Sequence, residues 1–292
     1  MLITKEFAMS LLPQRPAESN KGTFGKVLNI AGCINYQGAA YLSSLAPLKA
    51  GAGLVTLASI ETVINNLASC APWITFLPLK SYGGKCISHR AFKEIKKVID
   101  NYNVVSIGPG LSDCDAVGCF VEDTLNYLKD FEAKVVIDAD ALNIIAKSDI
   151  KSLPENSVIT PHPLELSRLL EVPVEVIQSD RVSAAKLAAG KFGCNVVLKG
   201  KNTIICSRNG EVFENQTGNS SLAKAGSGDV LTGMIAGFAA QGLDIVKASV
   251  LGVYLHGLCG ELASCDFTEY CVLATNQIDY IPKAIKTLLE QY

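Results

Sequence analysis

Apolar residues in the first two thirds of the chain gather in short, continuous runs rather than in an alternating pattern. Continuous runs of β-branched and aliphatic residues are typical of strands that are buried on both faces of a parallel sheet. The runs predict strands at residues 26–32, 54–58, 74–79, 104–108, 135–140, 157–160 and 195–200.

Segments with a helical spacing of apolar residues separate these runs, at residues 38–50, 61–70, 90–100, 115–129, 164–170 and 174–191. Because strands and helices alternate, the pattern predicts an α/β fold with a mostly parallel central sheet and helices on both faces. After residue 200, two short runs flank Asn209-Gly210, which predicts a β-hairpin. The rest of the chain is expected to be helical, at residues 229–241, 244–264 and 275–290.

The sequence contains no internal repeat and no linker rich in Pro, Gly or Ser, so a single domain over residues 1–292 is expected. Apolar residues make up 49% of the chain, which is enough for a sizeable core. The formal net charge of −2 leaves no electrostatic footprint for nucleic acid or for an anionic membrane. No secretory signal is recognised, and no uninterrupted apolar run reaches the roughly 18 residues of a membrane span.

The ten cysteines are scattered, without a C-x-x-C pair and without histidines at metal-ligand spacing. Such cysteines usually serve as small apolar core residues in a reducing compartment. We therefore expect a cytoplasmic protein.

The loops of interest for function are those at the ends of the predicted strands, because ligands of open α/β sheets bind outside the carboxyl ends of the strands. Taken singly, each of these loops is explained by a simple turn. Six of them are small or polar, which is more than turn formation requires, and together they predict a ligand cleft: GCINYQGAA, GPGLSD, DADALN, TPHPLE, KGKNT and AGSGD.

The last of these loops predicts an anion site. Gly226 and Gly228 let the backbone approach a ligand closely, and a helix that starts near Asp229 directs its unpaired N–H groups at the loop. Asp229 could instead cap that helix, and spacing alone favours neither interpretation. The segment is neither a Walker A loop nor a Rossmann fingerprint. Gly233 and Gly237 are expected to serve close helix packing.

Three other strand ends carry candidate side chains, each with an ordinary structural alternative. Asp138 and Asp140 could hold Mg²⁺ directly or through its waters, or one of them could cap a helix. His162, held between two prolines, could contact a ligand or be an ordinary turn residue. Lys199-Gly200 could meet a nucleotide, although a loop lysine is normally just solvated.

Taken in order, seven segments resemble the family of ADP/ATP-dependent NAD(P)H-hydrate dehydratases, also called the YjeF C-terminal or carbohydrate-kinase-domain family. They are NKGTFGKVLNIAG, QGAAYLSSLAPLKAGAGLVTLA, IGPGL, VVIDADALN, ITPHPLEL, VVLKGKNTII and AGSGDVLTGMIAGFAAQG, and they cover the chain from about residue 20 to the last helix. The resemblance implies a ribokinase-like fold. It also implies a lyase that uses ADP or ATP, with Mg²⁺, to return the S form of hydrated NADH or NADPH to NAD(P)H, releasing AMP or ADP and phosphate.

The resemblance also assigns residues to the two ligands. It places Ala40, Gly110 and His162 against the hydrated nicotinamide nucleotide, with Asp229 facing that substrate as the catalytic base. The adenine nucleotide would lie against a set of loop residues. No residue is assigned firmly to a metal, and Asp138 is the candidate that would hold Mg²⁺ through water. The nucleotide set is Lys199, Gly200, Lys201, Asn202, Thr203, Gly226, Ser227 and Gly228.

The chain departs from the family pattern in two respects. Leu164 stands where the family usually has Gly in a P-H-P-G-E sequence, and leucine cannot supply a positive φ cheaply, which bears on the pose of the His162 loop. Many relatives also carry an N-terminal epimerase domain. We expect none here, so that any epimerase would be a separate protein, and relatives suggest a homo-oligomer, a tetramer.

Two alternatives share the same residues. A ribokinase-like kinase of a vitamin precursor, such as hydroxymethylpyrimidine or hydroxyethylthiazole, would use Asp229 and the glycine loop but stop at a stable phosphate ester. The QGAAYLSSLAPLKAGAGLVTLA and DADALN segments favour the dehydratase. A nucleotide sensor without turnover would need no general base, so the presence of Asp229 argues against it.

Overall fold

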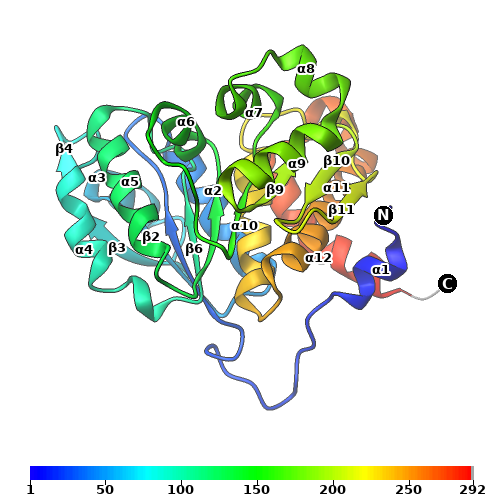
Figure 1. The fold of residues 1–292 in the computed structure, drawn as a ribbon. Coiled ribbons are helices and arrows are strands. Elements are labelled where there is room, and N and C mark those ends of the chain that lie inside the picture. Colours follow the sequence, from blue (N-terminus) through cyan, green and yellow to red (C-terminus); the bar gives the residue numbers. More distant parts are fainter. Residues whose placement is uncertain (291–292) are drawn as a thin grey trace.

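The strands form one nine-stranded sheet in the computed structural model, which describes residues 1–290 of the chain (Figure 1). The strand order is β11-β10-β9-β8-β7-β6-β1-β2-β3, and all neighbours are parallel except β9–β10 and β10–β11. The bounds are β1 Lys26–Ile30, β2 Leu54–Ile60, β3 Thr75–Leu79, β6 Val104–Ile107, β7 Lys134–Ile137, β8 Ser157–Ile159, β9 Asn195–Leu198, β10 Thr203–Cys206 and β11 Val212–Asn215. The mostly parallel sheet and the hairpin at Asn209-Gly210 are confirmed.

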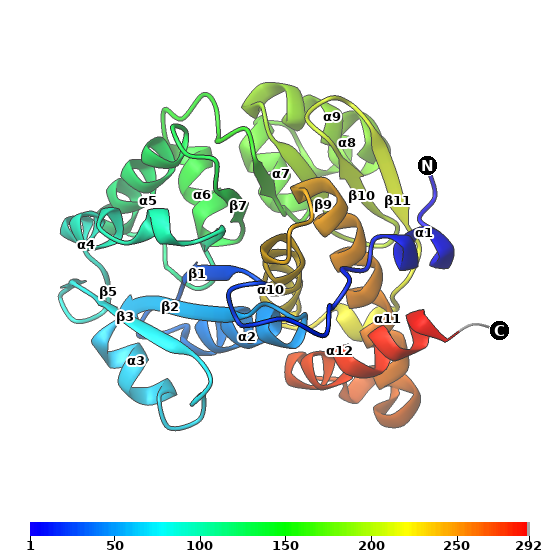
Figure 2. The same ribbon diagram turned by 90° about the horizontal axis from the view of Figure 1, so that it is seen from below.

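Helices cover both faces of the sheet, as the continuous apolar strands predict (Figure 2). One face carries α4 (Phe92–Lys96), α5 (Asp115–Leu128), α6 (Asp140–Lys147), α7 (Pro163–Leu170), α8 (Val174–Ser179) and α9 (Arg181–Phe192). The other carries α2 (Gln37–Lys49), α10 (Ser227–Ala240), α11 (Ile245–Cys271) and α12 (Ala274–Leu289), with α3 (Glu61–Leu67) beside α2. Alternate residues of the central strands therefore enter two separate apolar clusters, Leu28 in one and Val27 in the other.

The helices α2 and α10 pack against each other at two glycines of α10. A Cβ at Gly233 would lie 2.7 Å from the Ala46 Cβ, and one at Gly237 would lie 2.7 Å from the Pro47 carbonyl oxygen. No larger residue fits at either position without a shift of α2. The expected packing role of these glycines is confirmed.

The structure corrects three helix predictions. The single helix predicted over 174–191 is wrong: it is two helices, because Asp180 leaves the helical conformation (φ −147, ψ 83) and its carboxylate accepts a hydrogen bond from the Ser183 N–H to cap α9. The segment 90–100 contains only the short α4 between two 3₁₀ turns. The helix predicted over 244–264 also ends later than expected: it runs to a kink at Thr268, which has a non-helical backbone, and helical conformation resumes as far as Cys271.

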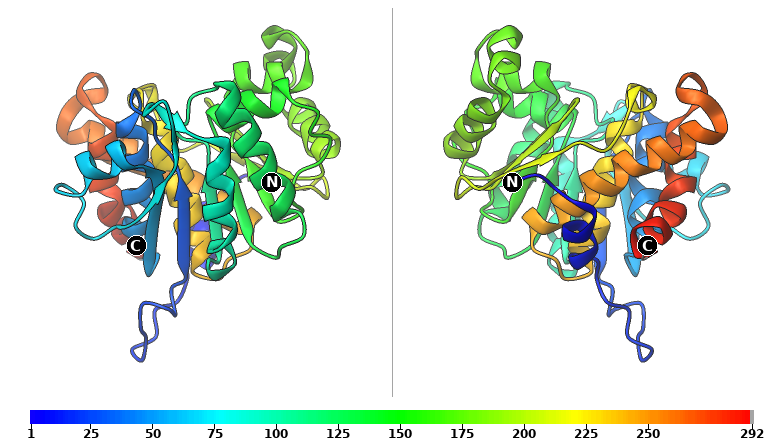
Figure 3. Two further views of the ribbon diagram at one scale, coloured as in Figure 1. Left: turned by 90° about the vertical axis from the view of Figure 1, so that its left-hand side faces the viewer. Right: turned by 90° about the vertical axis from the view of Figure 1, so that its right-hand side faces the viewer.

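Short elements escaped prediction. These are α1 (Lys5–Ser10), the 3₁₀ turn η3 (Ser220–Leu222) and a two-stranded ribbon of β4 (Ser81–Tyr82) and β5 (Cys86–Ile87). The N-terminal residues pair with the edge strand, where the Ile3 N–H donates to the Glu214 carbonyl oxygen. The chain then runs as an extended loop to the amino end of β1 (Figure 3), so this segment lies away from the carboxyl edge of the sheet.

One helix among residues 1–290, α11, is long and apolar enough to cross a membrane by length and composition alone. Of its most apolar window, 67% is buried inside the fold, as is usual for a core helix. Its hydropathy is therefore weak evidence for a membrane span.

Candidate active site

A cavity of about 1040 Å³ lies at the carboxyl ends of β7, β8 and β9, where the sequence predicts a ligand cleft. Its volume suits a nucleotide-sized ligand. Five segments supply most of the lining: residues 138–139, 162–163, 199–203, 215–224 and 226–229, with further side chains from α10 and α11. The loops meet because parallel strands place their carboxyl ends at one edge of the sheet.

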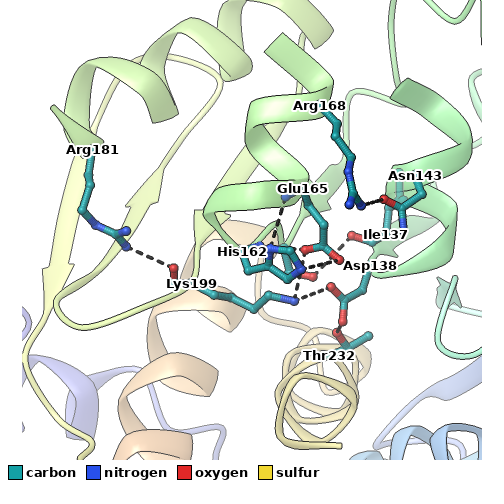
Figure 4. A network of polar contacts seen from close by, with 10 residues as sticks. Ile137, Asp138, Asn143, His162, Glu165, Arg168, Arg181, Lys199 and Thr232 are labelled. Atoms are coloured by element: carbon teal, nitrogen blue, oxygen red, sulfur yellow. Dashed lines mark hydrogen bonds and ion pairs between the residues drawn. The ribbon is translucent and has the colours of Figure 1, made fainter. Parts of the chain in front are cut away.

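A buried ion pair stands at the base of the cavity (Figure 4). The Lys199 Nζ lies 2.7 Å from Asp138 Oδ1 and 3.8 Å from Glu165 Oε2, while the Thr232 hydroxyl donates to Asp138 Oδ2 at 2.7 Å. The Asp138 side chain is only 1% exposed and that of Lys199 18% exposed. Burial lowers the pKa of Lys199, but the two carboxylates outweigh this and raise it, so that the ammonium form is held. The loop lysine is therefore not simply solvated.

His162 both caps a helix and lines the cavity. Its Nδ1 accepts from the Glu165 N–H at 3.1 Å, and Glu165 Oε2 accepts from the His162 N–H at 2.7 Å, which completes a capping box. Since Nδ1 is an acceptor, the neutral ring carries its hydrogen on Nε2. Burial, followed by the charge of Lys199, lowers the pKa of His162. Leu164 lies in the first turn of α7, so it requires no positive φ, and the departure from the family glycine leaves the loop regular.

The start of α10 shows whether Asp229 caps this helix or belongs to an anion site. The helix begins at Ser227, two residues before the predicted start, and its N-cap is Gly226 in the left-handed conformation (φ 90), without a side-chain cap. Within residues 1–290, the Asp229 carboxylate has no hydrogen-bond partner, and the N–H groups of Gly228 and Asp229 have no acceptor. Asp229 therefore does not cap the helix. The Gly228 and Asp229 N–H groups have no partner and face the cavity, as an anion site requires.

Two carboxyl groups near the cavity have strongly raised pKa values. Burial, and then the negative charge of Asp138, raise the pKa of Asp229 to about 7 against the opposing charge of Lys199. Burial likewise raises the pKa of Glu165 to about 7. A carboxylate that titrates near neutrality is a suitable general base.

The two aspartates of the DADALN segment point in different directions. Ala139 between them adopts φ 53 and ψ −120, a backbone region that a residue with a Cβ rarely occupies. Asp138 lines the cavity, whereas Asp140 Oδ2 accepts the Ser112 N–H at 2.8 Å. The turn at Ala139 therefore assigns the site to Asp138 and leaves Asp140 to hold a neighbouring loop.

The profile of a family described as NAD(P)H-hydrate dehydratase matches residues 27–283. The chain belongs to the NAD(P)H-hydrate dehydratase family. It is 34% identical over 97% of its length to the ADP-dependent (S)-NAD(P)H-hydrate dehydratase of Bacillus subtilis, of which it covers 97%. It is 38% identical over 99% of its length to the bifunctional NAD(P)H-hydrate repair enzyme Nnr of Moorella thermoacetica.

Solved structures agree with this family. An ADP/ATP-dependent NAD(P)H-hydrate dehydratase from Bacillus subtilis, co-crystallised with ATP and Mg²⁺, superimposes with a TM-score of 0.84 at 32% identity and covers 98% of both chains. A ribokinase-like superfamily protein from Enterococcus faecalis gives a TM-score of 0.85, covering 98% of this chain and 95% of that one, at 29% identity. The ribokinase-like fold is thereby confirmed. The chain spans about half the length of the bifunctional relatives, 54% for the Moorella protein.

The residues that the family resemblance assigns to the adenine nucleotide come together in the cavity. Lys199 to Thr203 all line it, and the Arg181 guanidinium supports this turn by donating to the Leu198 and Lys199 carbonyl oxygens at 3.0 and 3.2 Å. Of the substrate set, His162 and Asp229 line the same cavity.

Ala40 and Gly110 do not line this cavity. Ala40 has no exposed surface, and Gly110 packs against Tyr36 and Ala39 at the start of α2. Ala40 lies in the first turn of α2, the helix after β1, and Gly110 lies on the loop after β6, both towards the carboxyl edge of the sheet. Their contact with a dehydratase substrate stays a prediction.

Three residues of the site were not predicted: Glu165, Thr232 and His256. Thr232 lies three residues after Asp229 on α10 and so shares its helix face, a spacing that could have revealed it. His256 comes from α11, and its Nε2 lies 3.2 Å from both Ser227 Oγ and Gln277 Oε1. Burial lowers the pKa of His256 to about 4, so it packs as a neutral ring behind the anion site. No local pattern indicates such a partner.

The residues present do not form a protein cage for magnesium. Within residues 1–290, no three His, Cys, Asp or Glu side chains are arranged to hold a metal ion. Both oxygens of Asp138 are already engaged, by Lys199 and by Thr232, so direct coordination is disfavoured. This set of residues fits a magnesium ion that binds together with nucleotide phosphates and keeps several of its waters. Asp138 would contact such an ion through a water.

Gly228→Ala is expected to weaken nucleotide binding about tenfold, or about 1.4 kcal/mol. A Cβ at this position would lie 3.3 Å from the Lys199 Nζ and 3.7 Å from Asp138 Oδ2, in the space beside the open N–H groups. Isothermal titration calorimetry with ADP and Mg²⁺ measures the effect. Gly118→Ala is the matched control, because a Cβ there, within α5, meets no atom within 4 Å. Equal ADP affinities for the two variants would show that no phosphate approaches Gly228.

Proposed function

We propose that this chain dehydrates the S form of hydrated NADH or NADPH at the expense of ADP or ATP, giving NAD(P)H, AMP or ADP, and phosphate. The observation that carries the proposal is the start of α10. There, the unpaired carboxylate of Asp229, with a pKa of about 7, stands beside two free N–H donors and the cation Lys199. The same activity is in the name of the Bacillus subtilis relative, with which this chain aligns over 97% of both.

Phosphorylation of the ring hydroxyl is the first step of the proposed reaction. Asp229 takes the hydroxyl proton, the hydroxyl oxygen forms a bond to the terminal phosphorus of the nucleotide, and the bond from that phosphorus to the bridging oxygen breaks. The N–H groups of Gly228 and Asp229 and the Lys199 ammonium stabilise the charge on the transferring group. Magnesium, when bound, neutralises the nucleotide phosphates.

Elimination is the second step. The lone pair of the ring nitrogen expels phosphate as the carbon–oxygen bond breaks, and the adjacent ring carbon then loses a proton to the departing phosphate or to water, which restores the double bond of the dihydronicotinamide. The oxygen of the added water thus leaves in the phosphate, its two hydrogens leave as protons, and Asp229 is free to release the one it took. The protein's task in this step is to hold the ring and exclude bulk water, and His162 stands at the cavity wall where it can orient the dinucleotide.

ADP is the proposed phosphoryl donor, on the name of the Bacillus subtilis relative. A vitamin-precursor kinase receives no comparable support. A hydroxyethylthiazole kinase of Pyrococcus horikoshii shares 14% identity at a TM-score of 0.61, which is a likeness of fold alone.

The decisive assay mixes the purified chain with hydrated NADH, Mg²⁺ and either ADP or ATP. Recovery of the dihydronicotinamide absorbance, with release of one phosphate per molecule restored, is the expected result. Consumption of nucleotide only with a vitamin precursor would overturn the proposal in favour of a kinase, and binding without turnover would favour a sensor.

The physiological setting is proposed on the same footing. Relatives named bifunctional repair enzymes support a functional link to an NAD(P)H-hydrate epimerase, which converts the hydrate epimer that this site does not accept. We also propose a cytoplasmic location and a homotetramer, and light scattering on the purified chain measures the latter.

A further inference from the structure

Two cysteines that are far apart in the sequence meet outside the proposed active site. Cys86 lies in β5 and Cys114 is the residue before α5, and their Sγ atoms are 3.0 Å apart. This separation is within about 1 Å of a disulfide bond length. Both are free thiols in the structure, and neither belongs to a metal-binding group among residues 1–290.

We propose that Cys86 and Cys114 form an oxidisable dithiol, a covalent modification site that a hydroperoxide converts reversibly into a disulfide. The pair joins two segments near the carboxyl edge of the sheet, outside the cavity described above. The β4–β5 ribbon binds the loop after β1, where the Ile34 N–H donates to the Lys85 carbonyl oxygen at 2.8 Å. The other segment is the loop after β6, which carries Gly110 and Ser112.

The two thiols are differentiated, as a two-step oxidation requires. Cys114 is partly exposed at the N-terminus of the 14-residue α5, whereas Cys86 is buried. Burial raises the pKa of the Cys114 thiol, but hydrogen bonds from the Cys86 thiol and from the Val117 and Ala116 N–H groups outweigh it, so that the pKa is lowered. Burial raises the pKa of Cys86 to about 12. Cys114 is therefore the attacking sulfur and Cys86 the resolving one.

The chemistry balances with a hydroperoxide as the oxidant. The Cys114 thiolate attacks the terminal peroxide oxygen, a sulfur–oxygen bond forms, and the oxygen–oxygen bond breaks to release an alcohol or water. The Cys86 sulfur then attacks the Cys114 sulfur, and the hydroxyl leaves with the Cys86 proton as water. Two thiols and one peroxide give one disulfide, one alcohol and one water, and a small dithiol reductant reverses the change.

The consequence is a covalent tie between the ribbon and the Gly110 loop. A disulfide between residues 86 and 114 closes a long loop, so it stabilises the fold chiefly by restricting the unfolded chain. Transient disulfides of this kind are the usual form in a reducing compartment. Cys33 is a third buried thiol near the pair, since it contributes to the raised pKa of Cys86, so the peptide map must identify the two sulfurs that are joined. Within residues 1–290, Cys86 and Cys114 are the thiols in direct contact, and one disulfide between them is expected.

The test uses the full chain, first reduced and then treated with tert-butyl hydroperoxide. We expect the loss of two thiols, a mass lower by two hydrogens, and a tryptic peptide of residues 86–90 joined to one of residues 98–129. The melting temperature is expected to rise by several degrees on oxidation and to return with dithiothreitol. These readouts do not depend on turnover, so they stand or fall separately from the proposed dehydratase activity.

Three variants make the outcome decisive. Cys114→Ser keeps a good helix-capping residue and is expected to abolish the two-hydrogen loss and the thermal shift, as is Cys86→Ala. Cys119→Ser is the matched control, because this exposed cysteine lies in the same tryptic peptide as Cys114. It should retain both effects. A cross-link that survives in Cys114→Ser, or oxidation of wild type that leaves the 86–114 pair reduced, overturns the proposal.

Discussion

Asp229→Asn is expected to lower turnover by about a hundred- to ten-thousand-fold, the usual contribution of a general base. Asparagine keeps the shape of the side chain but cannot accept the hydroxyl proton. Nucleotide affinity should change little, because the N–H groups of the α10 N-terminus remain in place. Initial rates of dihydronicotinamide recovery and ADP titrations separate the two effects, and Asp115→Asn, on the exposed start of α5, is the control.

The same variant is expected to be more stable than wild type above neutral pH. The folded-state pKa of Asp229 is raised from 3.8 to about 7, so between these values the folded state holds a proton that the unfolded state has released. Stability therefore falls as the pH rises through this window, and asparagine removes the loss. We expect a gain on the order of 1–3 kcal/mol in the free energy of unfolding at pH 8.

Activity of the wild type should show the opposite pH dependence. The base must be deprotonated, so kcat/KM is expected to rise with pH through about 7 and then level off. Full turnover of Asp229→Asn, or a kcat/KM that is flat across this range, would remove Asp229 from the role of base.

Lys199→Met is expected to lower the free energy of unfolding by about 3–5 kcal/mol, because it leaves buried carboxylates without their cation. The Lys199 Nζ contacts Asp138 at 2.7 Å and Glu165 at 3.8 Å, and both carboxylates are almost wholly buried. Chemical denaturation measures the loss. Lys93→Met, an exposed lysine on α4, is the control and should change stability by a few tenths of a kcal/mol.

A double variant separates the two causes of the stability loss in Lys199→Met, namely the unbalanced charge of the carboxylates and the lost packing of the lysine side chain. Adding Asp138→Asn to Lys199→Met removes one of the stranded charges, so the pair should be less destabilised than the sum of the single variants. The deficit of Lys199→Met should also shrink at pH 6, since Glu165, with a pKa of about 7, then takes up a proton. Additive single effects would show that the ion pair contributes nothing beyond its packing.

The fold could be predicted well from the sequence, because a two-face buried strand leaves a continuous apolar run that a surface element does not. The boundaries that failed depended on single residues. Asp180 breaks the helix between α8 and α9, and its capping bond to Ser183 competes with the helical pattern on both sides. The ribbon of β4 and β5 is too short to leave a period of its own.

The residues of the site could be predicted only where they follow a strand or begin a helix, because such boundaries can be recognised from the local sequence. His162 and Lys199 stand at strand ends, Asp229 lies in the first turn of α10, and the fold brings all three to one cavity. What these side chains do with their hydrogen bonds depends on tertiary packing. Nothing in the sequence indicates that Lys199 pairs with both Asp138 and Glu165, or that Asp229 is left without a partner.

The helix α10 is buried along its whole length except at Gly228 and Asp229. Water weakens the electric field of a helix wherever it surrounds the backbone, and here it can do so only at the cavity. The partial positive charge of this helix end therefore acts on a phosphoryl group with little dielectric loss. The Asp229 side chain is itself largely withdrawn from water at this helix end, and this, with the nearby charge of Asp138, raises the pKa of its carboxyl group. One largely buried helix thus provides both an electrostatic attraction for an anion and the raised basicity of the Asp229 carboxylate in its first turn.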